Sequence, residues 1–156
     1  ATVHDLLGGL PLPTGEAVPI EGVSLRPILE APASATVKAV ALSTYPRCPF
    51  ATGPQSYDAG CIHATERTGF PLMGFSLRTD EYRYTEYVAW NGTSLRPVWG
   101  AVHSRSLFNH SGDDGGADSF DAWEHENAAE SAPPALLAKL RKLLHESFAP
   151  AVSTTK

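Results

Sequence analysis

The most informative hydrophobic pattern lies between Met73 and Trp90. Apolar and polar residues alternate along 73–78, and 82–90 is dense in β-branched and aromatic residues, as half-buried strands tend to be. Three polar residues at 79–81 separate the two arms. The pattern predicts a β-hairpin at the centre of a small antiparallel sheet.

The second arm of this hairpin carries an acid on its more apolar face. Glu86 shares that face with Tyr82, Tyr84, Val88 and Trp90, opposite Arg83, Thr85, Tyr87 and Ala89. An inward carboxylate costs several kcal/mol unless it is paired. We therefore expect an arginine or backbone N–H groups from a neighbouring segment to meet Glu86, either as a structural ion pair or as part of a site.

Two short helical segments are predicted before the hairpin. Residues 1–10 have apolar side chains at helical spacing that stop at a Gly pair, which indicates the end of a helix begun upstream and hence a piece of a longer polypeptide. Residues 21–30 predict a helical turn with Pro27 near its start.

Two further strands are predicted, one on each side of the hairpin. Residues 36–45 form a Val- and Ala-rich run, and 98–108 alternate loosely with Trp99, Ala101 and His103 as one face. The segment 50–70 lacks periodicity and predicts an ordered loop. The acidic segment 109–130 does not fit an EF-hand and predicts a solvated loop, anchored to the sheet by its aromatic residues Phe120 and Trp123.

The clearest helix follows Pro133 and Pro134, a usual helix start. Its apolar stripe consists of Leu136, Leu137, Leu140, Leu143, Leu144 and Phe148, and the cations expected to face solvent are Lys139, Arg141 and Lys142. The predicted fold is α+β, a small antiparallel sheet with a packed C-terminal helix. We divide the chain into the tail end of an upstream domain and a connection at 1–35, the sheet domain at 36–150 and a disordered tail at 151–156.

Composition narrows the function classes. The 156 residues are 42% hydrophobic with a net charge of −5 and no Lys/Arg run, which suits one globular domain and argues against a nucleic-acid partner. No apolar stretch approaches the ~20 residues of a membrane span.

Cys48 and Cys61 flank a Pro-, Gly- and Ser-rich loop. The two residues could form a disulfide, remain free buried thiols or include a catalytic thiol. A disulfide would stabilise the folded protein by roughly 3 kcal/mol. The sequons at Asn91 and Asn109 agree with glycosylation in a secretory compartment, either secreted or lysosomal. No phosphate loop, nucleophile elbow or zinc pattern is present, and the six histidines are scattered.

Three segments resemble the C-terminal subdomain of iduronate-2-sulfatase-like members of the sulfatase family: Tyr45-Pro46-Arg47-Cys48-Pro49, the stretch 73–86, and Phe120-Asp121-Ala122-Trp123-Glu124. The segment 21–29 is similar to one widespread among sulfatases. The resemblance covers about Val3 to Phe148. It implies a smaller domain of an alkaline-phosphatase-like enzyme, with an antiparallel sheet and a packed C-terminal helix.

The resemblance also implies an activity. Such enzymes hydrolyse sulfate esters, for example of glycosaminoglycans, with a formylglycine nucleophile and a calcium ion. Arg47-Cys48-Pro49-Phe50 is not the motif that forms formylglycine. The nucleophile and metal ligands would lie in an upstream catalytic domain, so no catalytic or metal-binding residue is assigned here and the chain alone is expected to be inactive. Ser106-Leu107-Phe108-Asn109 departs from the Glu-Leu-Tyr-Asp frequent in relatives.

In this family the smaller domain lies beside the active-site cleft. We therefore expect Tyr45, Arg47 and His63, with Arg67 as a further candidate, to lie near a sulfated carbohydrate substrate, where arginine can grip sulfate or carboxylate with two hydrogen bonds. The competing interpretation pairs Arg47 internally with a carboxylate such as Glu86. The alternative function is a free-standing, non-catalytic domain that binds a glycan or a protein.

Overall fold

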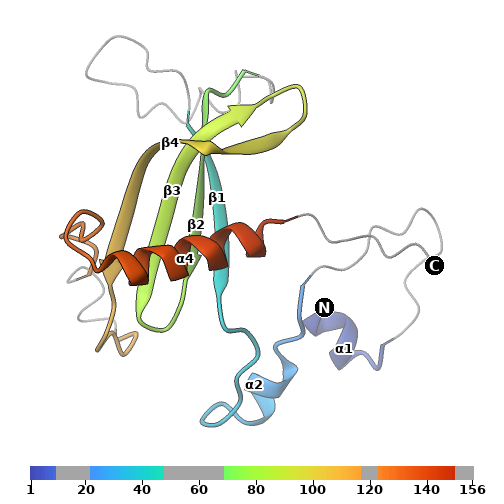
Figure 1. Ribbon diagram of the computed structural model, residues 1–156. Coiled ribbons are helices and arrows are strands. Elements are labelled where there is room, and N and C mark those ends of the chain that lie inside the picture. Colours follow the sequence, from blue (N-terminus) through green and yellow to red (C-terminus); the bar gives the residue numbers. More distant parts are fainter. Residues whose placement is uncertain (10–21, 48–68, 117–122, 150–156) are drawn as a thin grey trace. The chain divides into compact units, whose positions relative to one another are not determined.

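The computed structural model describes residues 1–9, 22–47, 69–116 and 123–149. The chain divides into two compact units, Ala1–Ala39 and Val40–Lys156. The first contains α1 (Thr2–Leu6) and α2 (Arg26–Glu30); the second contains β1 (Ala41–Arg47), β2 (Leu72–Arg78), β3 (Tyr82–Asn91), β4 (Arg96–Asn109) and α4 (Pro134–Ser147) (Figure 1). Within the described ranges, no helix has the length and apolar character needed to cross a membrane.

The first unit joins its two helices through polar contacts. The Ser24 hydroxyl donates to Asp5 at 2.7 Å, and the Leu25 N–H donates to the Thr2 hydroxyl at 2.9 Å. Pro27 stands in the first turn of α2, as predicted. Several large apolar side chains of this unit are exposed: Val3, Leu6, Leu7, Val23, Leu25, Ile28 and Leu29.

The second unit is built on a four-stranded antiparallel sheet with the order β1-β2-β3-β4. Each strand pairs with its neighbour in the sequence; short turns at 79–81 and 92–95 join β2 to β3 and β3 to β4, whereas the longer segment 48–71 separates β1 from β2. The central hairpin is confirmed: the Thr79 N–H donates to the Tyr82 carbonyl at 2.8 Å and closes the predicted turn.

Strand β1 begins later than the sequence pattern predicts. It covers Ala41–Arg47 and not 36–45, because its partner β2 sets its limits: Ala41 lies opposite Arg78, the last residue of β2, and Arg47 lies opposite Leu72, the first. Pro46 is tolerated inside the strand because β1 is an edge strand.

The predicted face of the last strand is partly wrong. Val102 lies opposite Val88 but Val98 lies opposite Ala89, so an irregularity in the pairing interrupts the alternation of β4. As a result Trp99 and Val102 pack against the core, whereas Ala101 and His103 are exposed.

Helix α4 crosses one face of the sheet transverse to the strands (Figure 1). Two residues of its predicted apolar stripe, Leu140 and Leu144, are buried and the other members are partly buried against the same cluster. The sheet contributes Phe75, Leu77, Tyr84, Val88 and Leu107 to this core. The α+β architecture is therefore confirmed, and it places the apolar face of the sheet beneath α4 and a polar face on the other side.

Candidate functional site

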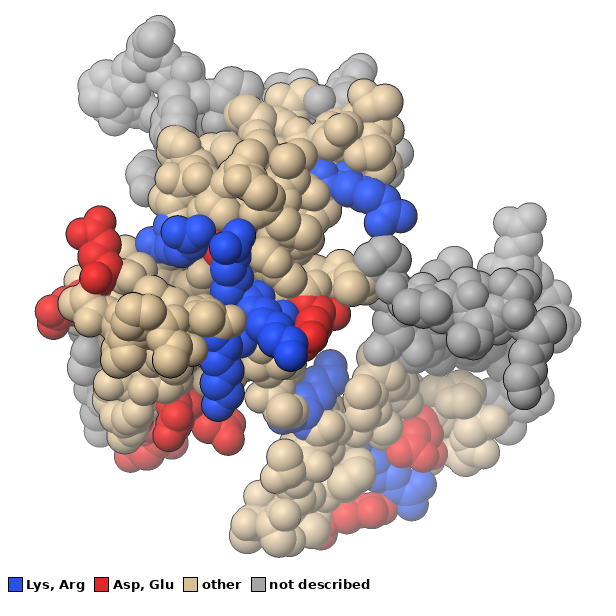
Figure 2. Space-filling model, viewed as in Figure 1, with Lys and Arg blue, Asp and Glu red and all other residues tan. Residues whose placement is uncertain are grey.

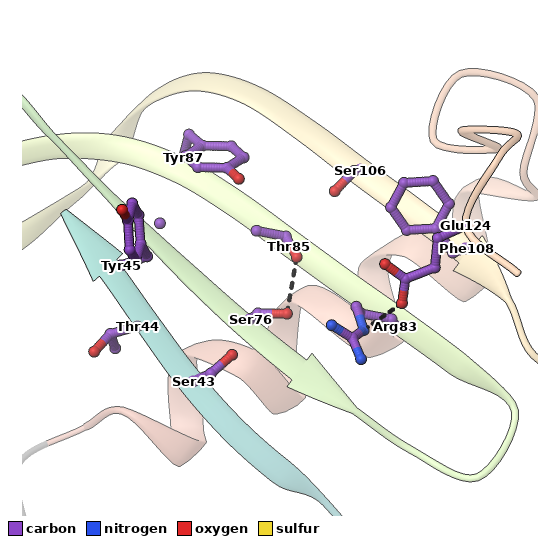
Figure 3. A pocket seen from close by; sticks show the side chains of 11 residues that line it. Ser43, Thr44, Tyr45, Ser76, Arg83, Thr85, Tyr87, Ser106, Phe108 and Glu124 are labelled. Atoms are coloured by element: carbon purple, nitrogen blue, oxygen red, sulfur yellow. Dashed lines mark hydrogen bonds and ion pairs between the residues drawn. The ribbon is translucent and has the colours of Figure 1, made fainter. Parts of the chain in front are cut away.

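The polar face of the sheet carries a row of hydroxyl groups that crosses all four strands. Ser43 lies opposite Ser76, Ser76 opposite Thr85, and Thr85 opposite Ser106. The Thr85 hydroxyl donates to the Ser76 hydroxyl at 2.8 Å (Figure 3). The side chains of Ser43 and Ser106 make no hydrogen bond to another residue in the described part of the chain, so their bonding capacity is available to a ligand.

The adjacent row places aromatic side chains around a glycine. Tyr45 lies opposite Gly74, which lies opposite Tyr87. A Cβ at position 74 would approach the Tyr87 Cε1 atom to 2.8 Å, so the tyrosine ring occupies space that only glycine leaves free. The Arg47 guanidinium lies 4.9 Å from the centre of the Tyr87 ring and donates to its hydroxyl at 3.2 Å.

A charged network borders the other end of the face. Arg83 forms an ion pair with Glu124 at 2.7 Å, and the same Glu124 oxygen lies 3.1 Å from Nε2 of His110. His110 is only 5% exposed, its Nδ1 lies 2.8 Å from Asp113, and its ring stacks on Trp123 at 5.8 Å. The two ring nitrogens of His110 thus join carboxylates from two segments, Asp113 directly after β4 and Glu124 further along the chain.

Two acids of this network, Asp113 and Glu124, depart from their ordinary behaviour. The hydrogen bond from His110, the Gly115 N–H and the charge of Arg78 hold the pKa of Asp113 below its usual value. Glu124 also has a positive φ of 71°, which is uncommon for a residue with a side chain. In this conformation its carboxylate contacts both Arg83 and His110 at the edge of the face.

These elements enclose an open depression of about 230 Å³. Its lining residues come from β1, β2, β3, β4 and the segment after β4: Ser43, Thr44, Tyr45, Gly74, Ser76, Arg83, Thr85, Tyr87, Ser106, Phe108 and Glu124 (Figure 3). Hydroxyl groups, exposed aromatic surface and one ion pair make it a candidate binding site. Among its described residues, no nucleophile is paired with a general base.

The opposite face of the sheet buries Glu86 completely, as its position in the pattern predicts. Its Oε1 accepts hydrogen bonds from the Tyr84 hydroxyl at 2.7 Å and Arg105 Nε at 3.1 Å, and its Oε2 lies 2.9 Å from His145 Nε2. Arg141 Nε is 3.3 Å from Oε1. The expected arginine partners are confirmed, but the suggested pair with Arg47 is wrong because Arg47 contacts Tyr87 on the other face.

Burial alone would raise the pKa of Glu86, but hydrogen bonds from His145, Tyr84 and Arg105 outweigh it and lower the pKa. Burial and the neighbouring carboxylate raise the pKa of Tyr84. The carboxylate is fully enclosed and its oxygens are occupied, so Glu86 has a structural role in joining α4 to the sheet.

One cation of α4 does not behave as the pattern predicts. Lys and Arg side chains gather over the helix (Figure 2). Arg141, however, turns toward the sheet and donates to the Trp99 carbonyl at 3.1 Å instead of facing only solvent. His145 stacks on the Trp99 ring at 4.1 Å. Both contacts reach across from the helix because the irregular pairing of β4 presents Trp99 to it.

The residues predicted for substrate binding are divided by the structure. Tyr45 lines the depression with 54% of its surface exposed, and Arg47 lies beside it on Tyr87. His63, with Arg67, falls outside the described residues. So does the predicted disulfide between Cys48 and Cys61. No group of His, Cys, Asp or Glu in the described ranges is arranged to hold a metal ion.

The two predicted glycosylation sites are exposed. The Asn91 side-chain oxygen accepts hydrogen bonds from the Thr93 and Ser94 N–H groups, and the Asn109 side-chain oxygen accepts one from Ser111. Each side-chain amide nitrogen, the atom that would carry a glycan, makes no hydrogen bond to a described residue.

Sequence reasoning missed the hydroxyl row and the His110 network. The alternation of β2 and β3 already placed Ser76 and Thr85 away from the core. It could not align them with Ser43 and Ser106, because strand register depends on pairing between distant segments.

No protein-family model and no curated protein sequence matches this chain.

Proposed function

We propose that this chain is the C-terminal segment, or processed light chain, of an iduronate-2-sulfatase-like sulfatase that hydrolyses sulfate esters of a carbohydrate such as a glycosaminoglycan. One observation carries the proposal. The three segments that resemble this subfamily are distant in sequence, yet each supplies lining to the same depression: Tyr45 from the first, Gly74, Ser76, Arg83 and Thr85 from the second, and Glu124 from the third.

In this proposal the segment completes the fold and shapes the rim of the substrate cleft. The formylglycine nucleophile and the calcium ligands belong to an upstream catalytic domain, so the chain alone is inactive. The exposed apolar side chains of the first unit, including Leu6, Leu7 and Leu29, favour packing against such a domain. Tyr45 and Arg47 would face the substrate, with His63 as a further candidate.

The proposal places the protein in the secretory pathway, either secreted or lysosomal. A disulfide between Cys48 and Cys61 and glycans on Asn91 and Asn109 belong with that location. The exposed positions of both asparagines support the glycosylation part of this proposal.

A free-standing, non-catalytic glycan- or protein-binding domain is the second candidate. It is favoured by the same depression, because hydroxyl groups beside an exposed tyrosine can bind a ligand without chemistry.

The first experiment compares hydrolysis of an aryl sulfate by this chain and by the chain with its native upstream sequence restored. We expect turnover only in the restored protein. Arg47→Ala in that protein should lower turnover at least tenfold with the melting temperature retained, whereas the control Arg96→Ala should leave turnover unchanged. Absence of turnover in the restored, folded protein would favour the binding domain. An equal loss of folding and turnover in Arg47→Ala would assign Arg47 a structural role through Tyr87.

A further inference from the structure

On the polar face of the sheet, which we call the open face, the described residues that line the depression carry no net charge. Arg83 is the single cation and Glu124 the single anion among these described residues, and their side chains lie 2.7 Å apart. Arg47 lies next to the depression but does not line it, so its charge, packed on the Tyr87 ring, lies beside the depression and not within it. A sulfate or carboxylate entering the depression would therefore meet no unpaired cation among its lining residues, which argues against an anionic group as the occupant.

The hydrogen-bonding groups suit a ligand that also carries hydroxyl groups. Each serine, threonine and tyrosine hydroxyl can both donate and accept. The Thr85 hydroxyl donates to the Ser76 hydroxyl at 2.8 Å, whereas the hydroxyls of Ser43 and Ser106 on either side of this pair make no hydrogen bond to a described residue. The row thus offers two separated positions, each able to give and to receive a hydrogen bond.

The aromatic surface and the size of the depression define the shape of the occupant. Tyr45 keeps 54% of its surface exposed although it lines a polar depression, so its ring is available to pack against the C–H face of a ligand. The volume of about 230 Å³ lies below the ~300–1,000 Å³ of sites that enclose drug-sized molecules. It therefore suits one ring of a longer ligand.

We propose that the depression binds an uncharged, hydroxyl-rich ring, a neutral saccharide unit, which packs on Tyr45 and bonds to Ser43 and Ser106. This inference rests on the proposed function, which makes a carbohydrate the ligand of the open face. It deepens that function, because the sulfated residue of the substrate would lie outside the depression and a neutral unit of the same chain would lie inside it.

The test is an NMR titration of the full 156-residue chain. The probes are maltohexaose, cellohexaose and N-acetylchitohexaose as neutral ligands, and a heparin hexasaccharide as a sulfated one. We expect at least one neutral probe to shift the backbone amides of Ser43, Tyr45 and Ser106, with binding insensitive to added salt. The double variant Ser43→Ala/Ser106→Ala should weaken that binding about tenfold, as expected for two lost hydrogen bonds.

The matched control is Ser104→Ala, which removes a hydroxyl from the position opposite Tyr87 on the same strand as Ser106 but outside the depression. It should bind the neutral probe as the unaltered chain does. Thermal unfolding of each variant shows whether it is folded. Equal weakening by Ser104→Ala would overturn the assignment of the hydroxyl row.

Two other outcomes would overturn the inference. One is binding of the heparin hexasaccharide alone at these residues, weakened by salt; the other is no shift with any probe. Either result leaves the proposed function standing if the restored protein hydrolyses aryl sulfate. Conversely, neutral-probe binding without turnover in the restored protein would support this site and reject the sulfatase.

Discussion

The buried carboxylate of Glu86 gives the sharpest test of how α4 is held on the sheet. Glu86→Gln keeps the size of the side chain and one oxygen that can accept from Tyr84, but it removes the negative charge. The variant loses the charge-assisted contacts with Arg105 at 3.1 Å, Arg141 at 3.3 Å and His145 at 2.9 Å.

The magnitude follows from the exposure of the partners. Removing one member of a fully buried ion pair costs about 3–5 kcal/mol, because the other charge is left without a partner or water. Here the side chains of Arg105 and Arg141 are 42% and 41% exposed, so water can hydrate both in the variant. Hydrogen bonds to charged groups contribute ~1.5–3 kcal/mol each, and exposure reduces this. We expect the free energy of unfolding to fall by about 2–3 kcal/mol.

The assay is urea unfolding followed by tryptophan fluorescence, since Trp99 stacks on His145 within this cluster. The lowered pKa of Glu86 fixes the pH dependence. A carboxyl whose pKa is lower when folded stabilises the protein above its unfolded pKa, near 4.5, and loses this stabilisation as the pH falls through the folded pKa. The difference between the unaltered chain and Glu86→Gln should be full at pH 7 and shrink below about pH 4.5.

The matched control is Glu130→Gln, an exposed acid that should change stability by less than about 0.5 kcal/mol. If Glu86→Gln were as stable as the control at pH 7, the ion-pair cluster would not hold the helix. A difference that stayed constant down to pH 3 would refute the charge-based explanation.

Two further predictions concern the open face. Gly74→Ala should lower the free energy of unfolding by about 1–3 kcal/mol, because the new Cβ would lie 2.8 Å from the Tyr87 ring and displace the ring from Arg47. Denaturant unfolding measures this loss, and the double variant Gly74→Ala/Tyr87→Ala should recover part of it. An equal loss in both variants would contradict the clash. His110→Gln should lower the free energy of unfolding by about 2 kcal/mol, because it removes a buried hydrogen-bonding side chain. It should also raise the pKa of Asp113 toward its usual value, because the hydrogen bond from His110 is the main cause that lowers it. Carboxyl NMR titration follows this pKa, and an unchanged Asp113 titration would show that His110 is not its dominant partner.

Local periodicity predicted much of the fold. The alternation along 73–90 located the hairpin, and the leucine spacing after Pro134 located α4 with Leu140 and Leu144 inward. It failed at β4, where the irregular pairing near Val88 moved Val102 inward in place of Ala101 and His103. A bulge changes the side-chain face without any signature in the composition of the strand.

The sequence by itself determined that Glu86 is buried and needs a cation, because strand alternation fixes its face and an unpaired buried charge is too costly. Only the tertiary structure decided which cations meet it. Arg105 lies on β4 and Arg141 on α4. Their separation from Glu86 along the sequence does not reveal the strand register or the position of the helix on the sheet. The same reason applies to the open face: the hydroxyl residues are visible in the sequence, but only pairing of four strands aligns Ser43 with Ser106 across one site.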